Sequence, residues 1–165
     1  MADELLLQIG VLLEPERIVF HGNNKSRDEL QLAADLGVTV VADNWSDLEL
    51  LAELGLSQPV RLMLRFTPGI ECHTHEYIRT GHLDSKFGFD PDQIEPVLQH
   101  LKGCSWALVT GLHAHIGSQI FELQPHRDLA AVMADALKLA RELGHPVSDL
   151  NVGGGLGIRY VESDD

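Results

Sequence analysis

Short apolar runs alternate along most of the chain with stretches in which apolar residues recur at helical spacing. The apolar runs are rich in β-branched residues and predict strands at 17–20, 38–42, 60–66, 106–112 and 150–152. Residues spaced three and four apart predict helices over 3–13, 27–36, 47–54, 91–101 and 129–140. The chain is therefore expected to alternate strand and helix from its beginning to the glycine run at 153–155.

Capping residues indicate where two of these helices begin and end. Ser26 is followed three residues later by Glu29, which is the spacing of a capping box, and Gly37 suits the end of the same helix. Asn44 or Ser46 is expected to cap the next helix, because both side chains accept hydrogen bonds from a first helical turn.

Alternating strands and helices predict an α/β fold with a parallel sheet, since parallel strands need a helical crossover between them. A doubly wound sheet is one possibility, but such folds carry their glycines after the first strand. Here the glycines follow the fifth predicted strand. We therefore expect residues 1–165 to form a single domain, a partial (β/α)8 TIM barrel with about five strands, whose two edges would be left unpaired.

Composition narrows the function classes. The chain has 165 residues with 12 basic and 25 acidic side chains, a net charge of −13 that disfavours nucleic acid as a partner. No apolar stretch is long enough for a membrane helix, and the acidic beginning does not resemble a secretory signal. Cys72 and Cys104 lack the spacing of a metal or redox motif. These features predict a cytoplasmic protein without a membrane or nucleic-acid partner.

The glycine run Gly153, Gly154 and Gly155 directly follows the apolar segment 150–152. Consecutive glycines bury no side chain, but they leave backbone N–H groups accessible and allow close approach of a phosphate. A flexible turn is the alternative explanation. Ser118, which follows Gly117 beyond the fourth predicted strand, is a second candidate phosphate donor, unless its hydroxyl makes only a local turn hydrogen bond.

His113 and His115 lie two residues apart at the end of the fourth predicted strand. Such a pair suits zinc, but no further ligand is evident in the sequence, so we expect no metal. One imidazole stacked on a flat cofactor, with the other structural, is the favoured interpretation, and two structural histidines are the alternative. His73 and His75 form a similar pair, which we interpret as solvated loop residues.

Three further side chains are candidates for lining a site. Arg65 ends an apolar strand, where a charge needs a partner, and an acidic or heteroaromatic group would suit it. Lys86 lies among turn residues, and Asn23 directly follows a strand, where polar residues often line a barrel mouth. A solvated lysine, a surface arginine and a helix-capping asparagine are the alternatives.

The order and spacing of five segments resemble the fold-type III pyridoxal-phosphate decarboxylases, the family that acts on ornithine, arginine and diaminopimelate. The segments are His-Gly-Asn-Asn-Lys-Ser at 21–26, Arg-Phe-Thr-Pro-Gly at 65–69, Asp-Ser-Lys-Phe-Gly at 84–88, Gly-Leu-His-Ala-His-Ile-Gly-Ser-Gln at 111–119 and Leu-Asn-Val-Gly-Gly-Gly-Leu-Gly at 150–157. The segment 75–81 and the form His-Ile-Gly-Ser-Gln favour the diaminopimelate branch.

This resemblance implies a barrel of the alanine racemase type, pyridoxal 5′-phosphate as cofactor and a role for each motif residue. Glycines 153–155 and Ser118 would hold the phosphate, His115 would stack on the pyridine ring, and Arg65 would lie at the cofactor. Lys86, His113 and Asn23 would line the site. The implied activity is decarboxylation of meso-2,6-diaminopimelate to L-lysine, the last step of lysine biosynthesis, in a homodimeric parent enzyme.

The sequence also departs from the family pattern. It contains no Tyr-Ala-x-Lys segment, which carries the Schiff-base lysine, and no Glu-Pro-Gly-Arg segment. Lys25 and Lys86 lie on the wrong strands to replace that lysine. We therefore expect the chain to be the central part of the barrel, without the first strand, the last strand or a C-terminal β-domain. It would have no catalytic residue of its own and no turnover alone.

Two rival functions are also compatible with the sequence. A metal-dependent hydrolase barrel would use His113 and His115, but the glycine run has no role in it. A non-enzymatic barrel protein that binds pyridoxal phosphate is the second rival.

Overall fold

The computed structural model describes residues 14–70 and 87–159. The strands within this part form one parallel sheet of five strands in the order β1-β2-β3-β4-β5. Their bounds are β1 Val19–Phe20, β2 Thr39–Ala42, β3 Val60–Arg65, β4 Ala107–His113 and β5 Asp149–Asn151. The prediction of a parallel α/β sheet is confirmed.

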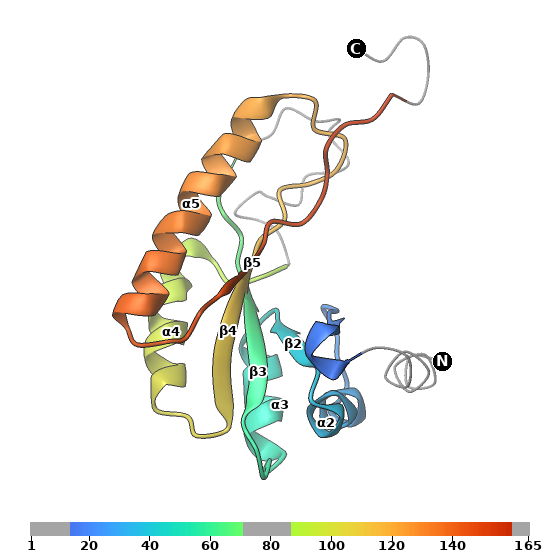
Figure 1. Ribbon diagram of the computed structural model, residues 1–165, viewed down its shortest axis with the longest axis vertical. Helices are drawn as coiled ribbons and strands as arrows, with labels where there is room; N and C mark the ends of the chain where they lie inside the picture. Colours follow the sequence, from blue (N-terminus) through green and yellow to red (C-terminus); the bar gives the residue numbers. More distant parts are fainter. Residues whose placement is uncertain (1–13, 71–86, 160–165) are drawn as a thin grey trace.

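Helices connect successive strands (Figure 1). The α-helices are α2 Arg27–Leu36, α3 Trp45–Glu53, α4 Ile94–Lys102 and α5 Leu123–Glu142, and the 3₁₀ helices are η1 Pro15–Arg17 and η2 Pro91–Gln93. Figure 1 shows α4 and α5 side by side along one stretch of the sheet, with α2 and α3 along the rest.

The strand order distinguishes a barrel from a doubly wound sheet. In a doubly wound sheet the order reverses at a switch point, whereas each strand here pairs with the strand before it in the sequence. An uninterrupted sequential order is the winding of a (β/α)8 barrel. The sheet is therefore half of such a barrel, as the position of the glycine run predicted.

The two faces of the sheet follow the alternation of side chains along each strand. Leu62, Leu64 and Leu112 belong to the apolar core that the strands share with the helices. Val41 and Met63 are also buried but lie outside that cluster, so they face the interior of the barrel. Burial on both faces explains why β2 is buried at every residue and lacks a polar alternation.

The predicted capping residues act as expected. The Ser26 hydroxyl accepts from the Glu29 N–H, the Glu29 carboxylate accepts from the Ser26 N–H, and Gly37 ends α2 with a φ of 68°. Asn44, rather than Ser46, caps α3, because its side-chain oxygen accepts from the Asp47 N–H.

Several predicted element ends are wrong by a few residues. The first predicted strand starts later, at Val19, because Pro15 begins a 3₁₀ turn that takes up Arg17. The helix predicted from 91 starts as η2 and becomes α-helical only at Ile94. Helix α5 begins at Leu123, earlier than its apolar stripe at 129–140 indicated. The helix predicted at 3–13 lies outside the described residues.

Within residues 14–70 and 87–159, no helix combines the length and apolar character that crossing a membrane requires.

Candidate functional site at the carboxyl ends of the strands

Polar side chains occupy one register row at the carboxyl ends of four strands. Arg65 pairs in register with His113, and His113 pairs with Asn151. Ala42 pairs with Leu64, so Asp43 comes next to Arg65 when that register is continued by one residue. In a parallel barrel these residues share the end at which active sites lie. The row thus brings together residues from four separate parts of the sequence.

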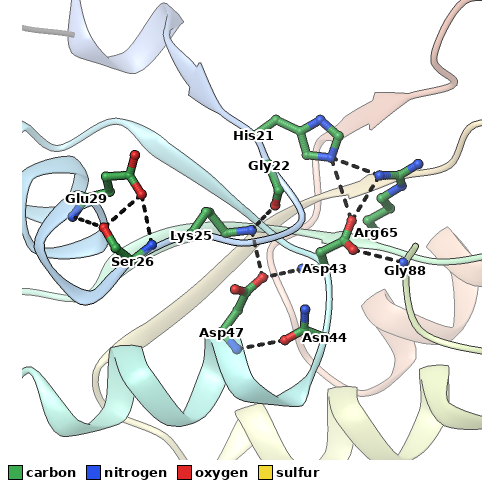
Figure 2. A network of polar contacts seen from close by, with 10 residues as sticks. All are labelled: His21, Gly22, Lys25, Ser26, Glu29, Asp43, Asn44, Asp47, Arg65 and Gly88. Carbon is green, nitrogen blue, oxygen red and sulfur yellow. Dashed lines mark hydrogen bonds and ion pairs between the residues drawn. The ribbon is translucent and has the colours of Figure 1, made fainter. Parts of the chain in front are cut away.

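A buried ion pair forms the first part of this row (Figure 2). Arg65 Nη1 lies 3.0 Å from Asp43 Oδ1, and the two side chains are 9% and 1% exposed. His21 Nε2 lies 3.4 Å from Arg65 Nη1 and 3.8 Å from Asp43 Oδ1. The guanidinium also lies 4.9 Å from the centre of the Phe87 ring. Arg65 thus has the acidic and aromatic partners that its position at a strand end suggested.

The pKa of Asp43 reflects opposing effects. Burial raises this pKa, but the polar contact with His21, the Arg65 charge and the Gly88 N–H together outweigh the effect of burial, so the net shift is downward. The Gly88 N–H donates to Asp43 Oδ2 at 3.2 Å. The carboxylate therefore stays ionised and holds the Arg65 guanidinium in place.

His113 is the next residue in the row and is buried, with 6% of its surface exposed. Its ring centre lies 4.9 Å from that of His21. Burial, followed by the His21 and Arg65 charges, lowers the pKa of His113 to about 4. Its Nδ1 is buried and has no hydrogen-bond partner among the described residues. His113 is therefore a neutral imidazole with one ring nitrogen available.

The loop after β4 and the loop after β5 lie against each other. A Cβ added to Gly153 would come within 2.5 Å of His115 Nδ1, and one added to Gly155 within 1.9 Å of the Gly117 carbonyl oxygen. Both glycines have positive φ, 70° and 102°. The structure therefore brings His115 and the glycine run together at one end of the sheet, and only glycine fits at these two contacts.

The amides of the glycine run are less accessible than the sequence suggested. The Gly153 N–H donates to the side-chain oxygen of Asn151 at 2.9 Å, so it is not free. Gly154 differs from its neighbours, because an added Cβ would meet no atom within 4 Å. Within the described part of the chain, neither the Gly154 nor the Gly155 N–H has a hydrogen-bond acceptor. These two amides are the ones available to an anion.

The remaining predicted site residues are more exposed to solvent or lie outside the described residues. Ser118 is exposed, and its Cα lies 3.5 Å from the position of a Cβ on Gly155. His115 is half-buried, and burial, followed by the Arg65 and His21 charges, lowers its pKa. Asn23 is exposed in the loop after β1. Lys86, like His73 and His75, lies outside the described residues.

Lys25 has a structural position that the sequence did not reveal (Figure 2). Its Nζ lies 2.7 Å from Asp47 Oδ2 and also donates to the Gly22 carbonyl oxygen, and the two charged side chains are only 2% and 4% exposed. Asp47 Oδ2 further accepts from the Asp43 N–H at 2.8 Å. This second ion pair joins the loop after β1 to the start of α3, directly beside the Asp43–Arg65 pair.

Sequence reasoning missed His21, Asp43 and Asn151 as site residues. Each is the first or last polar residue at the carboxyl end of its strand, which is the signal that would have found them in a barrel. Their partners come from other strands, however, so nothing local in the sequence distinguishes them from ordinary loop residues.

No group of three or more His, Cys, Asp or Glu side chains within residues 14–70 and 87–159 is arranged to hold a metal ion. The described residues instead fit a flat, phosphorylated group. A Cβ on Gly154 would meet no atom of the described residues, the Gly154 and Gly155 amides lack acceptors among those residues, and the His115 imidazole lies against Gly153. A parallel half-barrel with unpaired amides in the loops at the carboxyl ends of its strands is typical of barrels that bind a phosphorylated ligand there.

A comparison with protein families identifies the family itself. The model for the pyridoxal-binding domain of pyridoxal-dependent decarboxylases matches residues 2–165. The chain therefore belongs to this family, and the family predicted from the sequence motifs is confirmed. Pyridoxal phosphate as the cofactor of the family is confirmed with it.

Curated relatives of the chain include diaminopimelate decarboxylases from several bacteria. The chain is 57% identical over 152 residues to the enzyme of a Synechocystis strain, covering 91% of this chain and 32% of the relative. It is 41% identical over 168 residues to that of Bacillus subtilis, covering 98% and 38%. The chain thus spans about a third of the length of these relatives.

Solved structures of related enzymes share the fold. Diaminopimelate decarboxylase from Helicobacter pylori in complex with L-lysine matches with a TM-score of 0.85 and 29% identity over 98% of this chain and 42% of that one. The arginine decarboxylase of Paramecium bursaria Chlorella virus matches with a TM-score of 0.70 and 28% identity over 93% and 39%. The half-barrel is therefore the part of the family barrel that these chains have in common.

Proposed function

We propose that this chain forms part of the cofactor-binding barrel of a diaminopimelate decarboxylase, a pyridoxal-phosphate enzyme that converts meso-2,6-diaminopimelate to L-lysine and carbon dioxide. The observation that carries the proposal is the contact of His115 with Gly153, which sets an imidazole beside a glycine run at one end of the sheet. The substrate is inferred from the relatives, whose names specify diaminopimelate.

Different residues of this chain would bind different parts of the cofactor. The Gly154 and Gly155 N–H groups and the Ser118 hydroxyl would hold the phosphate, as an anion favours donors that lack an acceptor. His115 would lie against the pyridine ring. When bound, pyridoxal phosphate supplies an electron sink for the charge left as carbon dioxide departs. A neutral His115 suits that arrangement because it adds no further positive charge at the ring face.

Arg65, His113, Lys86 and Asn23 would line the site. The ion pair with Asp43 fixes the Arg65 guanidinium, so it would present a constant positive charge to an anionic group. His113 Nδ1 is buried and has no hydrogen-bond partner among the described residues, so it could bond to a ligand. Both features support a site that binds a polar amino acid next to the cofactor.

The proposal also covers the location of the protein, its oligomeric state and the activity of these 165 residues alone. The relatives are diaminopimelate decarboxylases from bacteria, and we propose that the protein is cytoplasmic. We propose that the parent enzyme is a homodimer, and that these 165 residues alone do not turn over substrate, because they contain no Tyr-Ala-x-Lys segment.

The test is to measure pyridoxal-phosphate binding and carbon dioxide release from meso-2,6-diaminopimelate, with L-lysine, L-ornithine and L-arginine as control substrates. The protein is assayed as these 165 residues and as the product of the complete reading frame that contains them. We expect cofactor binding and diaminopimelate-specific release from the latter, and no release from the 165 residues. Binding without release from either would instead favour a non-enzymatic cofactor carrier, and absence of binding would contradict the proposal.

A further inference from the structure

Gln119 is the one non-glycine residue among those described that has a positive φ, 58°. L-residues with a branched or long side chain adopt this conformation rarely, and where they do the surrounding structure holds them in it. Gln119 directly follows Ser118 in the loop after β4. The conformation turns its side chain toward the segment that follows the glycine run.

The Gln119 amide makes two hydrogen bonds to the backbone of a single residue, Ile158. Gln119 Nε2 donates to the Ile158 carbonyl oxygen at 3.0 Å, and the Ile158 N–H donates to Gln119 Oε1 at 3.0 Å. The side-chain amide therefore does what a backbone peptide group does in a strand pair, because it offers a donor and an acceptor to the same residue.

These bonds extend a short ladder between the two loops. The Ile120 N–H donates to the Gly155 carbonyl oxygen at 2.8 Å, and the Gly157 N–H donates to the Ile120 carbonyl oxygen at 2.9 Å. At the other end of the loops, the Ala114 N–H donates to the Asn151 carbonyl oxygen at 3.0 Å. Between these attachments, Gly153 contacts His115, and neither Gly153 nor Gly154 makes a backbone hydrogen bond to the opposite loop within the described residues.

The geometry points to Gln119 as a positioning residue for the phosphate-binding loop. By holding Ile158, its side chain fixes the distal end of the segment 153–158 against the loop that carries His115 and Ser118. The Gly154 and Gly155 amides and the Ser118 hydroxyl are thereby kept in one arrangement before the phosphate binds. Preorganised donors bind an anion more tightly than donors that must first be ordered. This inference rests on the proposed function.

Two variants separate the side-chain bonds from the backbone conformation. Gln119→Ala removes both bonds but leaves a Cβ in the left-handed region. Gln119→Gly also removes both bonds but favours the positive φ. If Gln119 served only to allow the turn conformation, Gln119→Gly would match or exceed the unmodified protein in amide protection and in phosphate binding. Gln31→Ala is the matched control, since the Gln31 side chain donates within its own helix to Asp35 at 2.9 Å and has no other hydrogen bond among the described residues.

The first measurement is amide hydrogen exchange without any ligand, which tests the attachment itself. Both Gln119 variants should speed exchange of the Ile158 and Gly157 amides about tenfold, while Gln31→Ala leaves it unchanged. Unchanged exchange in the two Gln119 variants would overturn the inference. This readout does not depend on whether the protein binds a cofactor.

The second measurement compares pyridoxal 5′-phosphate with pyridoxal, which lacks the phosphate, as probes of the complete protein. Both Gln119 variants should weaken binding of the phosphorylated compound about tenfold and leave pyridoxal binding within about twofold. Equal weakening of the two compounds, or no weakening, would overturn the positioning role. If the unmodified protein binds neither compound, the proposed function fails and the phosphate role falls with it, whereas the exchange result still decides the attachment.

Discussion

At the residue scale, the neutral state of His113 links the site to the stability of the fold. A buried histidine with an adjacent guanidinium and a second imidazole has a depressed pKa because its charged form is poorly solvated and repelled. The lowered pKa that keeps the ring neutral also makes folding sensitive to acid, because His113 binds a proton in the unfolded chain at pH values where it stays neutral in the folded protein.

The first prediction concerns this acid sensitivity. The pKa of His113 is about 4 in the folded protein, against an ordinary value of 6.5 that applies to the unfolded chain. The stability associated with the neutral ring is therefore fully present above pH 6.5 and is lost as the pH falls toward 4. We expect the free energy of unfolding to drop by about 2 kcal/mol between pH 7.5 and 5 on account of this group. Urea unfolding at both pH values measures the drop.

His113→Gln is the comparison variant, because it keeps a polar side chain that does not titrate. Groups far from His113 contribute equally to both proteins, so the difference between their pH dependences reports His113 together with its coupling to His21 and His115. A parent and variant that lose the same stability between the two pH values would show that the ring is not held neutral.

The second prediction separates two neighbouring glycines. An alanine at 154 meets no atom within 4 Å, whereas an alanine at 155 meets the Gly117 carbonyl oxygen at 1.9 Å with a φ of 102°. Gly154→Ala should change stability by less than about 1 kcal/mol, and Gly155→Ala should lower it by at least about 2 kcal/mol. Gly154→Ala should nonetheless weaken pyridoxal-phosphate binding, since its methyl group occupies the proposed phosphate space.

Urea unfolding and cofactor titration of both glycine variants measure these effects. Full cofactor affinity in Gly154→Ala would mean that the phosphate lies elsewhere.

At the scale of elements, buried charge joins the loop after β1 to α3. Lys25 and Asp47 each come from a different element and are almost fully excluded from solvent. Burying two charges is costly, and the attraction between them offsets this cost only while both are present. The pair therefore fixes how the two elements meet more than it stabilises the protein.

The third prediction follows from that asymmetry. Lys25→Met leaves the Asp47 carboxylate buried without its cation and should lower the free energy of unfolding by about 3–5 kcal/mol. The double variant Lys25→Met/Asp47→Asn retains an acceptor for the Asp43 N–H and should recover a large part of that loss. Denaturant unfolding of Lys25→Met, Asp47→Asn and the double variant gives the coupling free energy between the two side chains. Losses that simply add would contradict a buried, mutually dependent pair.

At the scale of the whole molecule, acidic residues outnumber basic ones by 25 to 12. The exposed ion pairs, such as Arg27–Glu53 at 3.0 Å and Lys138–Glu142 at 3.9 Å, contribute little because solvent screens them. General repulsion between carboxylates should thus dominate the long-range electrostatics of the folded state.

The fourth prediction is that salt stabilises this protein. Raising sodium chloride from about 20 to 300 mM shortens the Debye length and screens the repulsion, so the urea midpoint should rise. A midpoint that falls would indicate that attractive surface pairs outweigh the net charge. Sodium sulfate at matched ionic strength is not a suitable substitute, because sulfate also strengthens apolar burial.

Much of the fold could be predicted from sequence because its signals are local. The apolar runs gave strands such as 60–66 within one residue, and the Ser26–Glu29 spacing gave a true capping box. The late position of the glycines favoured a barrel over a doubly wound sheet, and the sequential strand order confirms the barrel. The site was only partly predictable: His115 and the glycine run carry local motifs, whereas the bonds of Asn151 to Gly153 and of Lys25 to Asp47 arise from tertiary packing.

The strictly sequential strand order has a consequence for how the chain is made. As the polypeptide leaves the ribosome, each new strand finds its partner already synthesised, so the sheet can grow from its N-terminal side without waiting for distant segments. Among the five described strands, the loops after β4 and β5, which we propose bind the phosphate, are made after the strands β1 to β3 that support them.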